Sequence, residues 1–259
     1  AEVVQSLAKW KRYALGVYGF EPGKGLYTDM NAIRRDELCD PLHSLYVDQW
    51  DWEKVITAQD RTIDFLKATV RKIYAALLKT AREVTALYPV LATSLPEDIV
   101  FISSRDLEDR YPSLTPEMRE REAVREYGAI FVTQIGGKLR SGIKHSGRAP
   151  DYDDWSLNGD IIVYYPLLDC AFELSSMGIR VNKVSLAAQL KAENMEERLS
   201  LPFHSMLMED KLPLTIGGGI GQSRLCMLLL NKAHIGEVQA SVWPDAVRNA
   251  CAADNIRLL

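Results

Sequence analysis

The sequence contains few cysteines and no recognisable metal-binding spacing. The cysteines are Cys39, Cys170, Cys226 and Cys251, and the histidines are His43, His145, His204 and His234. Because none of them has the spacing of a zinc site or a redox pair, we expect neither a zinc centre nor a disulfide framework. This thiol usage favours a reducing, cytoplasmic location. Cys226 lies in an apolar stretch with helical spacing, so we expect it to be a small core residue.

The sequence also lacks an excess of positive charge and long apolar runs. Its formal net charge is −4 over 259 residues, whereas proteins that bind nucleic acids usually carry a basic surface. No apolar run approaches the roughly 18 to 20 residues that a membrane-spanning helix needs. We therefore expect neither a nucleic acid nor a membrane as partner. Apolar residues make up 47% of the chain and charged residues 25%, which is typical of a globular protein with one or two domains.

Residues 214–230, LTIGGGIGQSRLCMLLL, are the most distinctive stretch. An apolar entry, four glycines and an apolar run with helical spacing predict a strand, a glycine turn and a helix. The first turn of a helix carries free N–H groups that bind anions, and Arg224 one turn further on can grip a phosphate. The spacing matches neither the dinucleotide fingerprint nor the P-loop. The alternative is a glycine turn before a buried helix, with Arg224 as a surface charge.

The N-terminal third predicts a helix followed by a strand pair. Residues 1–15 have helical spacing, and we expect Lys9 and Arg12 on its solvated face. Residues 26–37 and 42–53 alternate as two antiparallel strands. The second strand carries polar residues on both faces, which is typical of a sheet edge or of the floor of a site. Arg34 on the first strand is the candidate partner for an anion.

The remaining elements follow from periodicity and from helix-start residues. We expect helices over 57–87, from Thr115-Pro116-Glu117 onward, over 183–191 and over 202–209, and strands over 99–103, 129–135, 161–168, 172–180 and 237–242.

Two acidic features suggest cation binding. Asp151, Asp153 and Asp154 lie within four positions, either as an acidic surface loop or as ligands for an ammonium group or a cation. Glu173 lies in an otherwise apolar strand, where an isolated carboxylate usually has a cation as partner. Strand alternation predicts that Glu173, Ser175 and Met177 share one face.

These motifs together resemble the catalytic domains of class II aminoacyl-tRNA synthetases, and more closely the ammonia-dependent asparagine synthetase family. The resemblance runs along the whole chain. Its motifs are SLAKWKR (6–12), GLYT (25–28), PLHSLYVDQWDWE (41–53), IGGKL (135–139), RAPDYDDW (148–155), LNGDI (157–161), AFELSSMGIRV (171–181) and TIGGGIGQSRL (215–225).

The resemblance implies an α+β fold, with an antiparallel sheet flanked by helices in a single catalytic domain over residues 1–259, and a homodimer. It implies a ligase that joins aspartate to ammonia through a β-aspartyl-adenylate, converting ATP to AMP and pyrophosphate with Mg²⁺. Residues implied for ATP are Arg34, Ser44, Val47, Asp160, Glu173, Gly219 and Arg224. Residues implied for aspartate are Lys11, Gln49, Asp51, Asp153, Ser176 and Arg180. Asp160 and Glu173 would hold Mg²⁺, and Lys11, Arg34, Gln49 and Arg224 would serve catalysis.

The sequence departs from the family at two places. The family carries several dozen residues before the matched region, including a dimer-forming helix and strand, and we expect this segment to be missing here. Trp155-Ser156 leads directly into Leu157-Asn158 where the family has a longer, glycine-containing loop. Two alternatives stay open: an aspartyl- or asparaginyl-tRNA synthetase core, and a non-catalytic relative that binds adenylate or an amino acid. No cysteine has the setting of a glutaminase nucleophile, so free ammonia is the expected nitrogen donor.

Overall fold

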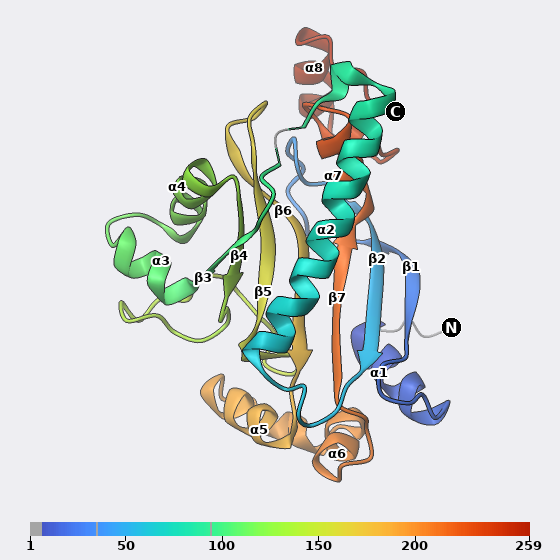
Figure 1. The fold of residues 1–259 in the computed structure, drawn as a ribbon, viewed down its shortest axis with the longest axis vertical. Helices are drawn as coiled ribbons and strands as arrows, with labels where there is room; N and C mark the ends of the chain where they lie inside the picture. The colour runs from blue at the N-terminus through green and yellow to red at the C-terminus, as the bar shows by residue number, and fades with distance from the viewer. Residues whose placement is uncertain (1–6, 35, 94) are drawn as a thin grey trace.

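A seven-stranded sheet runs through the computed structural model, which describes residues 7–34, 36–93 and 95–259 (Figure 1). The strands are β1 (Gly25–Ile33), β2 (Tyr46–Val55), β3 (Val100–Ser103), β4 (Ala129–Thr133), β5 (Asp153–Tyr165), β6 (Cys170–Arg180) and β7 (Thr215–Gly221). Their order is β1-β2-β7-β6-β5-β4-β3. The expected antiparallel sheet is confirmed with one exception, because β3 and β4 run parallel.

Helices cover both faces and one end of this sheet (Figure 1). They are α1 (Leu7–Val17), α2 (Ile63–Leu87), α3 (Ser104–Arg110), α4 (Pro116–Tyr127), α5 (Lys183–Ala192), α6 (Pro202–Met208), α7 (Gln222–Leu229) and α8 (Asp245–Ala253). The long helix α2 lies across one face over the main apolar core. Helices α3 and α4 pack on the opposite face beside β4. None of the helices within the described ranges is long and apolar enough to cross a membrane.

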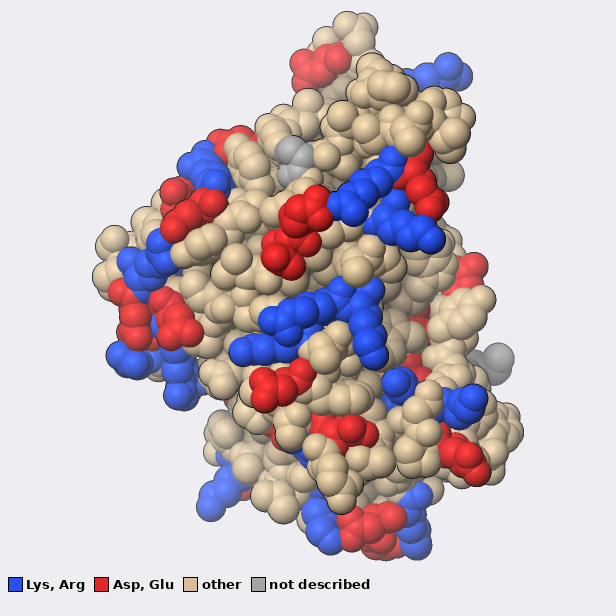
Figure 2. All heavy atoms as spheres, viewed as in Figure 1, with Lys and Arg blue, Asp and Glu red and all other residues tan. Residues whose placement is uncertain are grey.

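The side of the molecule that α2 covers carries charges of both signs. Figure 2 shows Lys and Arg gathered over the middle of this side, with Asp and Glu beside them. On α2, Lys79 pairs with Glu83, and Arg82 pairs with Glu97. Such exposed pairs contribute little to stability. The polar site described below lies on the other face.

The expected antiparallel strand pair near the N-terminus is confirmed. Strand β1 pairs with β2 from Gly25 opposite Lys54 to Ile33 opposite Tyr46. Strand β1 forms the sheet edge, and β2 lies one strand further in, beside β7. Arg34 follows the last residue of β1, and its backbone N–H donates to the carbonyl of Leu45. The pair therefore places Arg34 beside the strand that carries the polar residues.

Several predicted elements are confirmed, and others shift. The Thr115 hydroxyl caps α4 and Pro116 opens it, and the strands around 99–103, 129–135, 161–168 and 172–180 and the helices around 183–191 and 202–209 are present. Helix α2 begins only at Ile63, because Thr62 caps it. The predicted strand over 237–242 is wrong: this stretch forms no strand, and α8 follows it.

The first helix is confirmed from Leu7 onward, and residues 1–6 of the prediction lie outside the described residues. Arg12 is buried, so its prediction as a solvated residue is wrong. Its Nε donates to the carbonyl of Pro213 and its Nη1 to that of Val181, each at 2.8 Å. A buried guanidinium needs such acceptors. Arg12 thus ties α1 to the segments that flank β6 and β7.

Candidate active site

Alternate residues of β2 form a polar floor on the sheet face opposite α2. Gln49, Asp51 and Glu53 share that face, because Trp52 between them packs against the apolar core. Lys11 of α1 lies over this floor with its Nζ 2.5 Å from Asp51 Oδ1. Burial lowers the pKa of Lys11, and the bond to Asp51 opposes that shift. Of the two alternatives for this strand, the sheet edge is excluded, because β2 lies between β1 and β7.

The glycines lie inside strand β7, so the predicted glycine turn is wrong. They pair with β2 on one side and β6 on the other. A Cβ on Gly217 would collide with the Glu53 carboxylate, and one on Gly219 would lie 2.5 Å from Gln49 Oε1. Side chains from the neighbouring strand cross over β7 at these positions. The glycines therefore serve close approach rather than chain reversal.

The start of α7 is held by a carboxylate of β2. The backbone N–H of Ser223 donates to Asp48 Oδ1 at 3.1 Å, and its hydroxyl donates to Asp48 Oδ2 at 2.6 Å. One of the N–H groups expected to bind an anion is thus already occupied. Arg224 lies in this first helical turn, earlier in the helix than the one-turn offset that the sequence predicted.

A buried ion network joins side chains of β2, β6 and β5 across strand β7. Arg180 Nη2 lies 2.8 Å from Glu53 Oε2, and Arg180 Nη1 lies 2.5 Å from Asp153 Oδ1. Burial alone would lower the pKa of Arg180, but the two carboxylates raise it above its usual range. Arg180 is therefore a fixed cation whose position is set from two strands.

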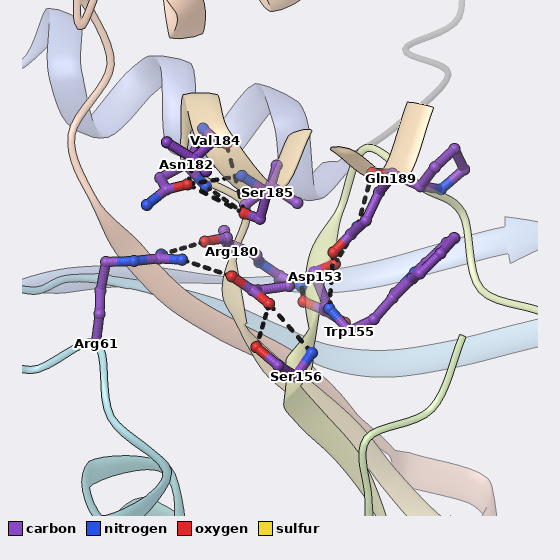
Figure 3. A network of polar contacts seen from close by, with 12 residues as sticks. Arg61, Asp153, Trp155, Ser156, Arg180, Asn182, Val184, Ser185 and Gln189 are labelled. Atoms are coloured by element: carbon purple, nitrogen blue, oxygen red, sulfur yellow. Dashed lines mark hydrogen bonds and ion pairs between the residues drawn. The ribbon is translucent and has the colours of Figure 1, made fainter. Parts of the chain in front are cut away.

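Further polar contacts surround Asp153 and Arg180 (Figure 3). Gln189 of α5 donates to the carbonyls of Pro150 and Asp153 and accepts the N–H of Trp155. Arg61 bonds Asp154 Oδ2 at 2.8 Å and also the carbonyl of Arg180. The segment that carries Asp153 is thus clamped to α5 and to the residues before α2.

The three clustered aspartates are all buried, so they do not form an acidic surface loop. Each pairs with cations. Asp151 bonds Lys9 at 2.8 Å and His204 at 2.9 Å, whereas Asp153 and Asp154 bond Arg180 and Arg61. The cations are side chains of the protein, which the sequence reading had left open.

Cys226 is exposed, so its prediction as a core residue is wrong. Helix α7 buries the residues on either side of it, Leu225 and Met227.

A cavity of about 280 Å³ opens beside this network. Its lining residues are Ala8, Asp51, Arg148, Ala149, Tyr152, Asp153, Ser176, Arg180, Gly218 and Gly219. Of the residues expected to bind aspartate, Asp51, Asp153, Ser176 and Arg180 line it. Lys11 stands behind Asp51, and Gln49 lines the adjoining cavity instead. Two carboxylates, the guanidinium groups of Arg148 and Arg180 and a hydroxyl offer partners for the charged groups of an amino acid.

A second cavity of about 400 Å³ lies between the β1–β2 connection, β6 and the start of α7. It brings together most of the residues expected for ATP, namely Arg34, Ser44, Val47, Glu173, Gly219 and Arg224. Arg34 is half exposed and pairs with Glu37 at 3.1 Å. Its loose surface pairing leaves it able to bind a phosphate.

Arg224 is oriented by a chain of polar groups. Its Nη1 donates to the carbonyl of Glu173, and its Nη2 donates to His43 Nε2, each at 3.0 Å. His43 Nδ1 in turn lies 2.9 Å from the Asp40 carboxylate. Partial burial would raise the pKa of Asp40, but the bonds with His43 and the backbone lower it. Sequence reasoning missed this role of His43, which precedes the polar strand by only a few residues.

The two cavities meet at three residues, because Arg148, Ser176 and Gly219 line both. Ser176 lies opposite Gly219 in the β6–β7 pair and opposite Asp160 in the β5–β6 pair. The predicted alternation along β6 is wrong. Met177 packs in the core, because the register of β6 against β5 shifts between Glu173 and Ser175.

Asp160 and Glu173 lie near each other on β5 and β6. Burial raises the pKa of Asp160, and the Arg148 guanidinium that binds it opposes this shift while Glu173 adds to it. The Oδ1 atom of Asp160 is buried and has no hydrogen-bond partner. Two carboxylates with an unsatisfied oxygen suit a hard cation whose other ligands are phosphate oxygens and water. Within the described ranges, no group of three or more His, Cys, Asp and Glu could hold a metal by itself.

Sequence comparisons place the chain among known proteins. The family model described as aspartate-ammonia ligase matches residues 1–255. The chain belongs to the aspartate–ammonia ligase family. It is 61% identical over 258 residues to an aspartate–ammonia ligase of Fusobacterium nucleatum, covering all of this chain and 79% of that protein. It is 58% identical to that of Bacillus cytotoxicus, covering 99% of this chain and 79% of the relative.

Solved structures share the fold of this family member at low sequence identity. The aspartyl-tRNA synthetase of Entamoeba histolytica aligns with a TM-score of 0.65 and 14% identity, over 92% of this chain and 50% of that one. The asparaginyl-tRNA synthetase of Pyrococcus horikoshii, solved with asparaginyl-adenylate, aligns with a TM-score of 0.63 and 15% identity, over 93% and 58%. The chain thus spans about half the length of these synthetases, and it has the expected class II synthetase fold.

Proposed function

We propose that this chain makes L-asparagine from L-aspartate and ammonia, with ATP cleaved to AMP and pyrophosphate. The observation that carries this proposal is the junction of an amino-acid-sized cavity and a larger, arginine-flanked cavity, in a chain of the aspartate–ammonia ligase family. The family assignment disfavours both alternatives, a tRNA synthetase core and a non-catalytic relative.

The first step forms a bond between a β-carboxylate oxygen of aspartate and the α-phosphorus of ATP, and pyrophosphate leaves. Arg34 would hold the α-phosphate and Arg224 the outer phosphates. Negative charge moves towards the leaving pyrophosphate in this step, so fixed cations at those places lower the barrier. Arg224 is already oriented by His43 and the Glu173 carbonyl. Ser44, Val47 and Gly219 would line the nucleotide.

In the second step the nitrogen of ammonia attacks the β-carbonyl carbon, the bond to AMP breaks, and the nitrogen loses a proton. Asp51 and Asp153 would hold the α-ammonium of aspartate, and Arg180 its α-carboxylate. Gln49, which lies across Gly219, would reach the reacting β-carboxyl group from the nucleotide side. Ser176 would complete this pocket, and Lys11 would hold Asp51 in place. A carboxylate pair for ammonium and an arginine for carboxylate match the charges of the substrate.

We also propose that Asp160 and Glu173 hold a Mg²⁺ ion, which would neutralise phosphate charge when bound. The unsatisfied Asp160 oxygen supports this assignment. We propose further that residues 1–259 act as one catalytic domain of a cytoplasmic homodimer. Support for the dimer comes from the edge strand β1, where Tyr27 and Ile33 are exposed apolar residues.

The test is asparagine formation by the purified chain with aspartate, ATP and Mg²⁺. We expect product with ammonium, much less with glutamine, and no dependence on added tRNA. A requirement for tRNA would point to the synthetase alternative. ATP binding without any product would favour the non-catalytic relative.

A further inference from the structure

Arg148 occupies the boundary between the two cavities but belongs to no strand or helix. The other two residues shared by both cavities, Ser176 and Gly219, come from the central strands. Arg148 is the cation among the three. A ligand in the smaller cavity and a ligand in the larger one would both approach its guanidinium.

One nitrogen of the Arg148 guanidinium forms an ion pair, and the other two have weak partners or none. Its Nη2 bonds the Asp160 carboxylate. Its Nη1 makes only long contacts, 3.2 Å to the Gly147 carbonyl and 3.4 Å to the Ser146 hydroxyl. Its Nε is buried and has no hydrogen-bond partner. Buried guanidinium N–H groups are costly to leave unpaired, so this arrangement suits a site that a ligand completes.

The loop that carries Arg148 is fastened at several points. Glu108 of α3 accepts the backbone N–H groups of Arg140 at 2.8 Å and Ser141 at 3.1 Å. Further along, His145 lies 2.7 Å from Glu120 and Lys144 lies 2.7 Å from Glu193. These anchors come from α3, α4 and the end of α5. They fix the direction from which Arg148 reaches the junction.

We propose that Arg148 is a further catalytic residue, which contacts the β-carboxylate of aspartate and the α-phosphate of ATP while the adenylate forms. This inference rests on the proposed function. The oxygen that joins the two substrates must lie where the cavities meet, since the β-carboxylate enters from one and the α-phosphorus from the other. Arg148 is placed to hold both groups at that point.

The chemistry assigns Arg148 a definite task. As the carboxylate oxygen bonds to the α-phosphorus, the bond from that phosphorus to the bridging oxygen of pyrophosphate breaks, and the electron pair leaves with pyrophosphate. A cation that bridges the two anions reduces their repulsion as they approach, and it stabilises charge on the equatorial phosphate oxygens. Arg224 and Arg34 line only the larger cavity and Arg180 only the smaller one, whereas Arg148 lines both.

The experiment compares Arg148→Ala and Arg148→Lys with the control Arg140→Ala. Arg140 belongs to the same loop, but its side chain is 71% exposed and pairs with Asp109 at the surface. The rate measured is aspartate-dependent exchange of labelled pyrophosphate into ATP, which reports adenylate formation alone. Binding of ATP with Mg²⁺ and of aspartate is measured separately by calorimetry, and folding by thermal unfolding.

For Arg148→Ala we expect a loss of exchange rate of at least about 100-fold, as for other preorganised donors, with both dissociation constants changed by less than about threefold. Arg148→Lys should lose about tenfold, because an ammonium cannot bridge two groups as a fork. Arg140→Ala should match the wild type. If Arg148→Ala does not fold, Arg148→Lys decides the question by the same criterion.

The inference is overturned if Arg148→Ala keeps its exchange rate within threefold of the wild type. It is also overturned if ATP affinity falls as much as the exchange rate, since Arg148 would then only bind nucleotide or orient Asp160. Wild-type protein without exchange would instead refute the proposed function itself, and the inference with it.

Discussion

Arg180 and Glu53 form an ion pair that is almost fully buried, with Arg180 Nη2 2.8 Å from Glu53 Oε2. The pair crosses strand β7 at Gly217, where any side chain would displace the carboxylate. Glu53 lines neither cavity, so it would act on aspartate through Arg180. We propose that it is a positioning residue, which sequence reasoning missed although it continues the alternation of Gln49 and Asp51.

Glu53→Gln should weaken aspartate binding. The neutral amide leaves the guanidinium held by Asp153 alone, so we expect the KM for aspartate to rise about tenfold, the effect of losing roughly 1.4 kcal/mol of binding. The KM for ATP should change by less than twofold. Steady-state kinetics with each substrate varied in turn test this split. Glu97→Gln, which removes an exposed pair with Arg82, is the control; an unchanged KM for aspartate would argue against the positioning role.

Arg224→Ala should abolish adenylate formation while leaving the fold intact. We expect asparagine formation to fall by at least about 100-fold, because a fixed cation near the leaving phosphates is lost. His43→Ala should cost less, since it only orients Arg224. Arg248→Ala on the exposed face of α8 serves as a control for charge. Survival of ATP turnover in Arg224→Ala, with thermal unfolding unchanged, would mean that the phosphate role is wrong.

Glu173→Gln should raise the Mg²⁺ concentration needed for half-maximal activity. An amide oxygen is a weaker ligand than a carboxylate, and a shift of about tenfold or more is expected. Titration with Mg²⁺ at fixed ATP, after removal of metal by a chelator, measures the shift. If the titration curve of the variant superimposes on that of the wild type, the metal lies elsewhere.

Asp151→Asn should destabilise the protein near neutral pH more than in acid. Burial would raise the pKa of Asp151, but bonds from His204 and Lys9 hold it well below its usual range. A lowered folded-state pKa stabilises above the unfolded value of about 4 and loses that contribution as the pH falls further.

Asp151→Asn should lower the free energy of unfolding by about 3 kcal/mol at pH 7, and this decrease should become smaller below about pH 4. Urea unfolding at several pH values measures it, with the exposed Asp254→Asn as control. If the difference in free energy of unfolding between the variant and the wild type stays constant with pH, ionisation of Asp151 does not contribute to stability.

Local patterns predicted the strands that build the site better than they predicted its close contacts. Period-two alternation located β1 and β2, and helix-start residues located α4. The glycines of β7 look like a turn in sequence. Only the crossing of Glu53 and Gln49 over the strand explains why Gly217 and Gly219 lack side chains, and sequence spacing does not encode that crossing.

The misassigned residues share one cause, which is tertiary contact. Met177 packs in the core because the register shift between β5 and β6 changes which residues of β6 face α2. The sequence of β6 alone does not reveal that shift. Arg12 is charged and lies on an amphipathic helix, yet it is buried. Its guanidinium donates hydrogen bonds to two carbonyls far along the chain. Residues 237–242 do not form the expected strand, because they pair with no strand of the sheet. They are held by side-chain hydrogen bonds instead, such as the one that Gln239 donates to Ser223.

The central claim is that the β-carboxylate of aspartate is activated on the α-phosphate of ATP. We would supply aspartate with ¹⁸O at both oxygens of its β-carboxyl group, together with ATP, Mg²⁺ and ammonium, and examine the AMP by mass spectrometry. The account predicts one ¹⁸O atom in the phosphate of each AMP formed, with none in pyrophosphate. Unlabelled AMP, or label found only when the α-carboxyl group carries ¹⁸O, would contradict it.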